Sequence, residues 1–478
     1  MFTNKYLLKM VDKLNLKTTY HYSYFIYPFL VSNGRYGEFI NKFLSDNENW
    51  SFTIRDNEKD INTHAYYLPY VKRFLFPTLY WDEDLKHQYE RMPLKKKLDI
   101  VSKLTCVNFQ YKINESKKNN YKFNNTSINF EILKIELICF EPGICFLVLK
   151  TELDKADGVY SNDILDFNYK FRTINPRYQK KKKSDGMFIM NKGFNGVEDL
   201  SDFINHLLHG YEDVEKENIY FDRLFTYSYM CLDEDEWNEQ RDLSEITNEF
   251  YKFLYVLPGE YGSQLDSDFI DIKDNTYTKW AYSKYGFSRE SGVVFSSERE
   301  SFNRNKLPVY YESMYFYIFL LAFYQRIALI LFSQELMNSG TSKIENLKRR
   351  FTKFTHFSWF SQITNSEQGM DIWKKWQQAF DLPALFDEVQ KEYSEFYDYT
   401  VARGQENINL LLIIIYTVSL IFSAMTLLVD YKILNANNHA AKVFLLIVIA
   451  LTIAMYPIYL IGKMINKRLW KNSRKHFL

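Results

Sequence analysis

The sequence predicts an α+β cytoplasmic domain, followed by a long stalk helix and a C-terminal hairpin of two transmembrane helices. Three observations support this fold class. The chain ends with two uncharged apolar stretches, Ile408 to Val429 and Val443 to Ile461. Residues 1–307 mix β-rich runs with helical segments, which is typical of a mixed α/β domain. Residues 383–429 have a helical pattern that continues into the first apolar stretch.

The two apolar stretches are 22 and 19 residues long, and each is sufficient to cross a bilayer core of ~30 Å as a helix. The intervening segment 430–442 is short, so we expect the two helices to be antiparallel neighbours. The alternative is a pair of buried core helices in a soluble protein. That alternative is less consistent with stretches that have no polar face.

The charges that flank the two spans predict their orientation. The tail, residues 462–478, carries six basic residues and no acidic residue: Lys463, Lys467, Arg468, Lys471, Arg474 and Lys475. Basic residues favour the cytoplasmic side of a membrane. We therefore expect a multi-pass protein with both termini in the cytoplasm, an external loop at 430–442 and the lipid bilayer as a partner.

Composition excludes several classes of function. The net charge is +1 at pH 7, with basic and acidic residues interspersed, so we expect no direct contact with nucleic acid and only local anion sites. The four cysteines show no CxxC pair and no zinc spacing, which is typical of a reducing compartment. No nucleophile, P-loop or paired-carboxylate motif is present, so we predict that the chain is not an enzyme.

Several β-rich runs define the first domain. The run from Tyr20 to Leu30 is aromatic, and the run from Asn49 to Asp56 alternates with a period of two. Two longer runs flank Glu141-Pro142-Gly143, and a Pro-Gly turn between β-rich runs predicts a hairpin.

A basic segment, Asn175 to Gly186, contains Arg177 and four consecutive lysines that include Lys181. A solvated loop is one interpretation of this segment. The other is a flap over a ligand that carries phosphate, because clustered ammonium groups attract anions. The sequence leaves both open.

The next segment, which contains Asp202, His206 and His209, is predicted to form a helix. A histidine pair three residues apart can bind a metal ion. However, Asp202 and His209 lie ~10 Å apart along a helix axis, and no HExxH pattern is present. We therefore predict no metal site.

The stretch from Tyr277 to Pro308 combines aromatic residues, glycines and cations. Aromatic faces stack on purines and arginine pairs with phosphate, so this stretch is the first candidate for a nucleotide site. The alternative is a curved edge strand packed on helices. Its candidate ligand residues are Trp280, Lys284, Tyr285, Arg289, Arg299 and Arg304.

Residues 308–382 are predicted to be a helical cytoplasmic region. Tyr315 to Phe332 is apolar enough to resemble a third span, but Gln325 and Arg326 lie in its middle. A centred arginine costs ~2.5 kcal/mol or more in lipid. We therefore expect a buried helix within the cytoplasmic part of the chain.

The predicted stalk helix has an apolar seam, with residues from Leu382 to Thr400 recurring at spacings of four and three. Such a seam favours packing on another helix, and we expect a homo-oligomer around an axis. The first span also carries a polar stripe that can line a pore, although small hydroxyl residues also let membrane helices pack. The stripe consists of Asn409, Tyr416, Ser419, Ser423 and Thr426.

This layout resembles the CorA family of divalent-cation channels. The shared features are an α/β cytoplasmic domain, a stalk that enters the first span, a short external loop, a second span and a basic tail with Trp470. The Gly-Met-Asn signature of that family is absent. The loop instead offers Asn435, Asn437 and Asn438 as pore residues.

The missing signature and the aromatic domain resemble a divergent CorA-like branch found beside type III CRISPR loci. This resemblance implies a pentameric channel in the inner membrane of a prokaryote. It also implies an anti-phage effector gated by a nucleotide second messenger, the conjugate of S-adenosylmethionine with AMP (SAM-AMP). A second hypothesis is a CorA-type transporter of divalent cations (Mg²⁺ or Co²⁺), for which acidic stalk residues are suitable sensors. A membrane-anchored enzyme has the least support.

Overall fold

The computed structural model describes residues 14–32, 34–113, 119–123, 126–141, 143–174, 189–191, 196–198, 200–209, 223–239, 243–259, 275–338 and 344–430. The chain divides into two units, Met1–Tyr393 and Ser394–Leu478. The first unit is an α+β domain, and the second continues the C-terminal helix, so the α+β part of the predicted fold class is confirmed. The predicted loop, second span and tail, residues 431–478, lie outside the described residues.

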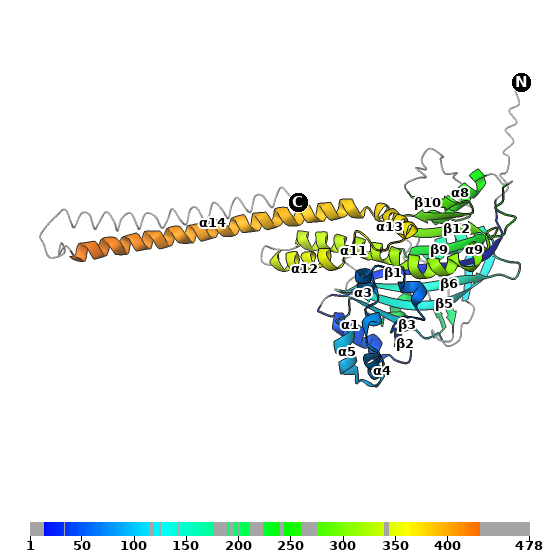
Figure 1. The fold of residues 1–478 in the computed structure, drawn as a ribbon, viewed down its shortest axis with the longest axis horizontal. Coiled ribbons are helices and arrows are strands. Elements are labelled where there is room, and N and C mark those ends of the chain that lie inside the picture. Colours follow the sequence, from blue (N-terminus) through cyan, green and yellow to red (C-terminus); the bar gives the residue numbers. More distant parts are fainter. Residues whose placement is uncertain are drawn as a thin grey trace, which may run out of the picture. The chain divides into compact units, whose positions relative to one another are not determined.

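A mixed ten-stranded sheet forms the centre of the first unit, and Figure 1 shows it as one twisted layer. The strand order is β10-β11-β12-β9-β1-β6-β5-β3-β2, and β4 pairs with β5 off this path. All described pairings in it are antiparallel except that of β12 with β9. The strands are β1 (Thr18–Leu30), β2 (Trp50–Phe52), β3 (Cys106–Tyr111), β4 (Asn119–Phe123), β5 (Thr126–Phe140), β6 (Ile144–Asp154), β9 (Phe225–Leu232), β10 (Thr276–Trp280), β11 (Ser283–Phe287) and β12 (Ser291–Ser297). A separate pair is formed by β7 (Ile189–Asn191) and β8 (Gly196–Glu198).

The hairpin predicted around the Pro-Gly turn is confirmed, because β5 and β6 pair in antiparallel fashion with Cys139 opposite Cys145. Gly143 in the turn has φ +116°, and a Cβ atom there would lie 2.0 Å from the carbonyl oxygen of Val31. Only glycine suits both the backbone conformation and the close approach of this neighbouring strand end.

The aromatic run predicted as an early strand is β1, and it lies in the interior of the sheet between β6 and β9. Its pairing with β9 ends at Ile26, so Pro28 lies beyond that ladder and pairs only with β6. A proline lacks the amide donor that a second ladder requires. The run from Asn49 to Asp56 forms a shorter strand than its alternation predicts, since β2 covers only Trp50–Phe52.

Helices cover both faces of the sheet. On one face, the buried core contains Phe25 of β1, Phe167 and Phe171 of α6 and Phe250 of α8. The helices that contribute to this core include α1 (Tyr36–Ser45), α6 (Ser161–Phe171), α7 (Leu200–Leu207) and α8 (Leu243–Leu254). On the other face, tyrosines of β1 and β9 contact the chain from Tyr311 onward, as in the stacking of Tyr227 on Tyr311 at 4.1 Å.

The buried helix predicted for Tyr315 to Phe332 is confirmed as α11 (Phe316–Asn338). In the continuous helical run Leu307–Met337, which includes α11 up to its last residue, 78% of the most apolar stretch of 18 residues is buried within the structure. Gln325 is fully buried and donates a hydrogen bond from Nε2 to the Ser358 carbonyl at 2.8 Å. The two polar residues that argued against a membrane span therefore have neighbours in the protein, since Arg326 lies over the Phe380 ring at 5.3 Å.

Three helices follow α11: α12 (Ile344–Phe357), α13 (Glu367–Ala379) and α14 (Leu382–Asp430). The predicted stalk helix is α14, with 49 residues, and it begins in the first unit. One face of its first turns is buried there, because Leu382 and Val389 are 0% exposed and Tyr393 stacks on Phe351 of α12 at 4.7 Å. The first part of the predicted apolar seam therefore packs on helices of its own chain.

The remaining small elements of the first unit connect these layers. Near β2 and β3 they are α2 (Ile61–His64), α3 (Pro69–Leu75), η1 (Pro77–Tyr80), α4 (Glu83–Arg91) and α5 (Leu94–Val101). Between β12 and α11 they are α9 (Ser301–Asn305), α10 (Leu307–Tyr310) and the π-helical turn η5 (Tyr311–Tyr315).

The burial of His21 predicts that the fold loses stability in acid. Its Nε2 atom accepts the Leu153 amide at 3.1 Å, and burial lowers the pKa of His21 to about 4 from 6.5. His21 in the unfolded chain binds a proton more readily than His21 in the fold. The free energy of unfolding therefore falls as the pH drops from about 6.5 to 4, by ~3 kcal/mol at most.

The substitution His21→Gln keeps an acceptor near the Leu153 amide but does not titrate. We expect urea unfolding of this variant to show a flatter dependence of stability on pH between 6.5 and 4 than the parent protein. Identical slopes in the two proteins would contradict the assignment of this acid sensitivity to His21.

Candidate functional site

The apolar part of α14 carries the predicted pore residues. An 18-residue window within Leu382–Ser423 is long and apolar enough to span a membrane, and none of it is buried in the structure. Two hydroxyls of the polar stripe donate to carbonyls one turn earlier, Ser423 to Ser419 at 2.9 Å and Thr426 to Phe422 at 2.7 Å. Tyr416 is 70% exposed, and Asn409 is also exposed. Asn435, Asn437 and Asn438 lie outside the described residues.

The predicted ligand stretch forms β10, β11, β12 and α9 at one edge of the sheet, in agreement with the edge-strand interpretation. Successive side chains of a strand point to opposite faces, and this separates two of the candidates. Lys284 donates to the Thr247 hydroxyl of α8 at 2.7 Å. Tyr285 is 2% exposed and accepts from Gln368 of α13 at 3.5 Å. These two residues therefore do not face one ligand.

The other candidates on this edge have separate neighbours. Trp280 is 49% exposed at the end of β10. Arg299 lies over the Tyr282 ring at 5.8 Å and 3.9 Å from Glu239. Arg304 pairs with Glu298 at 3.5 Å. Arg177 and Lys181 lie outside the described residues.

The contrast between Tyr285 and Trp280 gives a matched pair of substitutions. We expect Tyr285→Ala to lower the free energy of unfolding by ~3 kcal/mol, because a large buried side chain is lost. Trp280→Ala is expected to change it by less than ~0.5 kcal/mol, since half of the side chain is in solvent. Chemical denaturation measures both values, and equal losses would contradict this placement.

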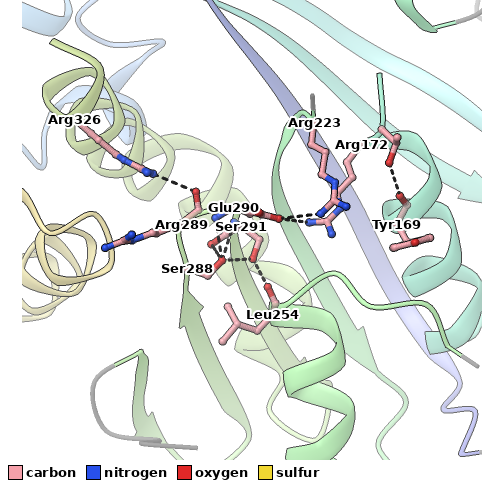
Figure 2. Close-up of polar contacts among 10 residues, drawn as sticks. Tyr169, Arg172, Arg223, Leu254, Ser288, Arg289, Glu290, Ser291 and Arg326 are labelled. Atoms are coloured by element: carbon pink, nitrogen blue, oxygen red, sulfur yellow. Dashed lines mark hydrogen bonds and ion pairs between the residues drawn. The ribbon is translucent and has the colours of Figure 1, made fainter. Parts of the chain in front are cut away.

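Of the predicted ligand residues, Arg289 is the one that lies close to other arginines. It lies in the β11–β12 turn, where the Ser288 hydroxyl accepts from the amides of Glu290 at 3.2 Å and Ser291 at 2.9 Å. The Ser291 hydroxyl in turn donates to the Leu254 carbonyl at the end of α8. Figure 2 shows this turn held between arginines from other elements.

Two of these arginines converge on Glu290. Arg172, directly after α6, donates from Nη1 to Glu290 Oε2 at 3.0 Å, and Arg223, two residues before β9, approaches the same oxygen at 3.5 Å. Figure 2 shows both guanidinium groups meeting this one carboxylate. The backbones of Thr173 and Arg223 form an isolated β-bridge, which holds the two segments side by side.

The other two arginines lie on the opposite side of the turn. Arg289 pairs with Asp381 at 3.0 Å, and Arg326 of α11 donates to the Arg289 carbonyl at 3.4 Å. Asp381 directly precedes α14 and has φ +58°, a left-handed conformation that asparagine, aspartate and histidine adopt more often than other non-glycine residues. The Asp381 carbonyl accepts the Leu385 amide at 3.0 Å and so begins the helix.

We call Arg172, Arg223, Arg289 and Arg326 the arginine cluster. With Glu290 and Asp381, the six groups carry four positive and two negative charges, so this set has a net charge of +2. The Arg172 side chain is 4% exposed, and its Nε has no hydrogen-bond partner among the described residues. Burial and the charge of Arg223 lower the pKa of Arg172 to about 10, although Glu290 opposes this shift. Burial and Arg289 likewise lower the pKa of Arg326.

The arginine cluster therefore consists of two separate pairs, one on each side of the β11–β12 turn, and together they give this region a local excess of positive charge. Of these four arginines, only Arg289 is among the ligand residues that the sequence predicts. The other three lie on distant segments, and no local pattern connects them.

A second feature is a cavity of about 460 Å³ between the end of α1 and α7. His209 lies 3.3 Å from Asp46 through Nε2, and burial lowers the pKa of His209 below its usual value. Among the described residues, no group of three potential metal-ligating side chains is close enough to hold an ion. The lining residues are Asp46, Asn49, Trp50, Tyr111, Asn205, His206, Leu207 and His209.

A scan of protein-family models, a search of curated proteins and a search of solved structures each return no match for this chain.

Proposed function

We propose that the chain is a homo-oligomeric membrane channel, gated by a small nucleotide messenger that binds to the first unit. One observation carries the proposal. The helix α14 begins at buried residues, Leu382 and Val389, and continues into a stretch where large apolar side chains are exposed, including Leu411 at 58% and Leu420 at 71%. Exposed apolar surface of this extent requires a covering, and lipid is the covering that suits an apolar helix.

A helix that begins in a folded domain can carry a ligand signal into a membrane. The ligand shifts the state of the channel only by the difference in its affinity for the closed and open states. A tenfold preference at each site contributes ~1.4 kcal/mol, and equivalent sites around an axis add. Several copies of the chain therefore give a sharper response than one.

The messenger class follows from the resemblance to the CorA-like branch and from the arginine cluster. On this proposal the channel is a type III CRISPR anti-phage effector in the inner membrane, and its ligand is of the SAM-AMP type. The net positive charge around Glu290 and Asp381 supports an anionic ligand. No catalytic residue and no resident cofactor form part of the proposal.

Reconstitution into liposomes tests the proposal. We expect ion flux across the liposome membrane to rise at least tenfold when SAM-AMP is added, with the purified protein migrating as an oligomer. Absence of SAM-AMP and cyclic oligoadenylate binding in calorimetry would exclude the gated channel. Flux of Mg²⁺ without any messenger, together with rescue of a strain deficient in Mg²⁺ uptake, would instead favour the CorA-type transporter.

Two hydroxyl residues of the first span give a matched pair for the pore. Ser423 belongs to the polar stripe, whereas Thr417 lies off it. We expect Ser423→Leu to reduce the open-channel flux severalfold, because an apolar side chain in the pore obstructs hydrated ions. Thr417→Leu is expected to leave the flux within twofold of the parent, and the reverse order would place the pore on another helix face.

A further inference from the structure

We propose that the cavity between the end of α1 and α7 binds a small organic cation that carries a primary ammonium group. The cavity measures about 460 Å³ and adjoins β2, the strand at one edge of the main sheet (Figure 1). This site is separate from that of the anionic messenger of the proposed channel. The volume of the cavity, the hydrogen-bond acceptors on its wall and the sign of their charge each favour this class of ligand.

Four segments of the first unit form the wall, so the cavity is built into the folded domain. Asp46 directly follows α1, Trp50 begins β2, Tyr111 ends β3 and His209 follows α7. Trp50 and Tyr111 are 2% and 8% exposed and contact each other edge to face at 5.1 Å, which gives the wall a rigid aromatic side. Small-molecule sites in proteins commonly measure ~300–1,000 Å³, and the cavity lies within that range.

Asp46 supplies the negative charge of the wall. Its Oδ1 atom accepts from the backbone amide of Asn49 at 3.3 Å and from Nδ2 of Asn49 at 2.9 Å, which orients the carboxylate. The other oxygen, Oδ2, lies 3.3 Å from Nε2 of His209, and the Asp46 side chain is 19% exposed. Asn49 is neutral, so the charge of this partly buried carboxylate is left uncompensated wherever His209 is also neutral. Such a carboxylate attracts a cation.

His209 is neutral at pH 7. Burial lowers its pKa, Asp46 opposes this shift, and Lys42 of α1 and His206 of α7 lower the pKa further. The imidazole ring contacts Phe43 of α1 edge to face at 5.3 Å, which holds it in place. With its proton on Nε2 toward Asp46, a neutral imidazole keeps Nδ1 as an acceptor.

The other polar groups of the wall add acceptors rather than positive charge. Asn49 uses Nδ2 on Asp46, so its Oδ1 atom remains an acceptor, and Asn205 Oδ1 is buried without a hydrogen-bond partner among the described residues. No lysine or arginine belongs to the described lining, and Lys112, directly after β3, donates to the Asn47 carbonyl at 2.6 Å. Several acceptors around one carboxylate suit a primary ammonium, which is a cation with three N–H donors.

The binding test uses the full chain in detergent and calorimetry, with phenethylammonium and putrescine as probes. We expect at least one of them to bind. The trimethylammonium analogue of the probe that binds is expected to be at least tenfold weaker, because methylation keeps the charge but removes the N–H donors. Phenylpropionate, an anion of similar size, is expected not to bind. Failure of both ammonium probes, or a preference for phenylpropionate, would overturn the site.

Asp46→Asn is expected to weaken binding of the ammonium probe at least tenfold, because it removes the charge and keeps an acceptor for Asn49. Glu48→Gln is the matched control, since it removes the same charge from an exposed residue of the same turn that does not belong to the described lining. We expect this control to bind within twofold of the parent. Thermal unfolding of each variant verifies that it is folded, and equal affinities for folded Asp46→Asn and the parent would contradict the assignment.

His206 provides a test of both signs, because it is exposed and belongs to the lining. We expect His206→Glu to strengthen binding of the ammonium probe severalfold and His206→Lys to weaken it severalfold. Misfolding would not produce opposite effects from two changes at one exposed position. Stronger binding in His206→Lys than in His206→Glu would show that the cavity does not select a cation.

Discussion

The burial of α11 between the sheet and the later helices is the constraint on which the rest of the structure depends. Phe319 stacks on Phe225 of β9 at 4.5 Å and also contacts Trp376 of α13 at 4.9 Å. Phe332 contacts both Phe351 of α12 and Tyr393 of α14. A helix with protein on several sides has to be apolar all round, and this explains why its composition imitates that of a membrane span.

The same helix connects the sheet with the start of α14. Helix α11 contacts both the sheet, through Phe319 and Phe225, and the first turns of α14, through Phe332 and Tyr393. Arg326 of α11 also donates to the β11–β12 turn, and Arg289 of that turn holds Asp381 at the start of α14. The β11–β12 turn, α11 and the first turns of α14 are thus packed together within the first unit.

The sequence predicted the elements whose signals are local. The Pro-Gly hairpin and the buried α11 follow from turn residues and from one arginine in an apolar run. The sheet order does not, because β1 pairs with strands more than a hundred positions away and β12 pairs in parallel with β9. The candidate site was predictable only in part for the same reason. Arg289 lies in a suggestive stretch, whereas Arg172 and Arg223 become its neighbours only through long-range pairing.

The central claim is that α14 extends from a buried base into the lipid bilayer, and cysteine accessibility tests it most directly. The four native cysteines are buried, so background labelling is low. Membrane vesicles of both orientations carrying Glu395→Cys, Ile413→Cys or Leu420→Cys would be treated with a membrane-impermeant maleimide. The account predicts that position 395 is labelled only from the cytoplasmic side, and that positions 413 and 420 are protected on both sides. Labelling of positions 413 and 420 at the rate of position 395 would contradict it.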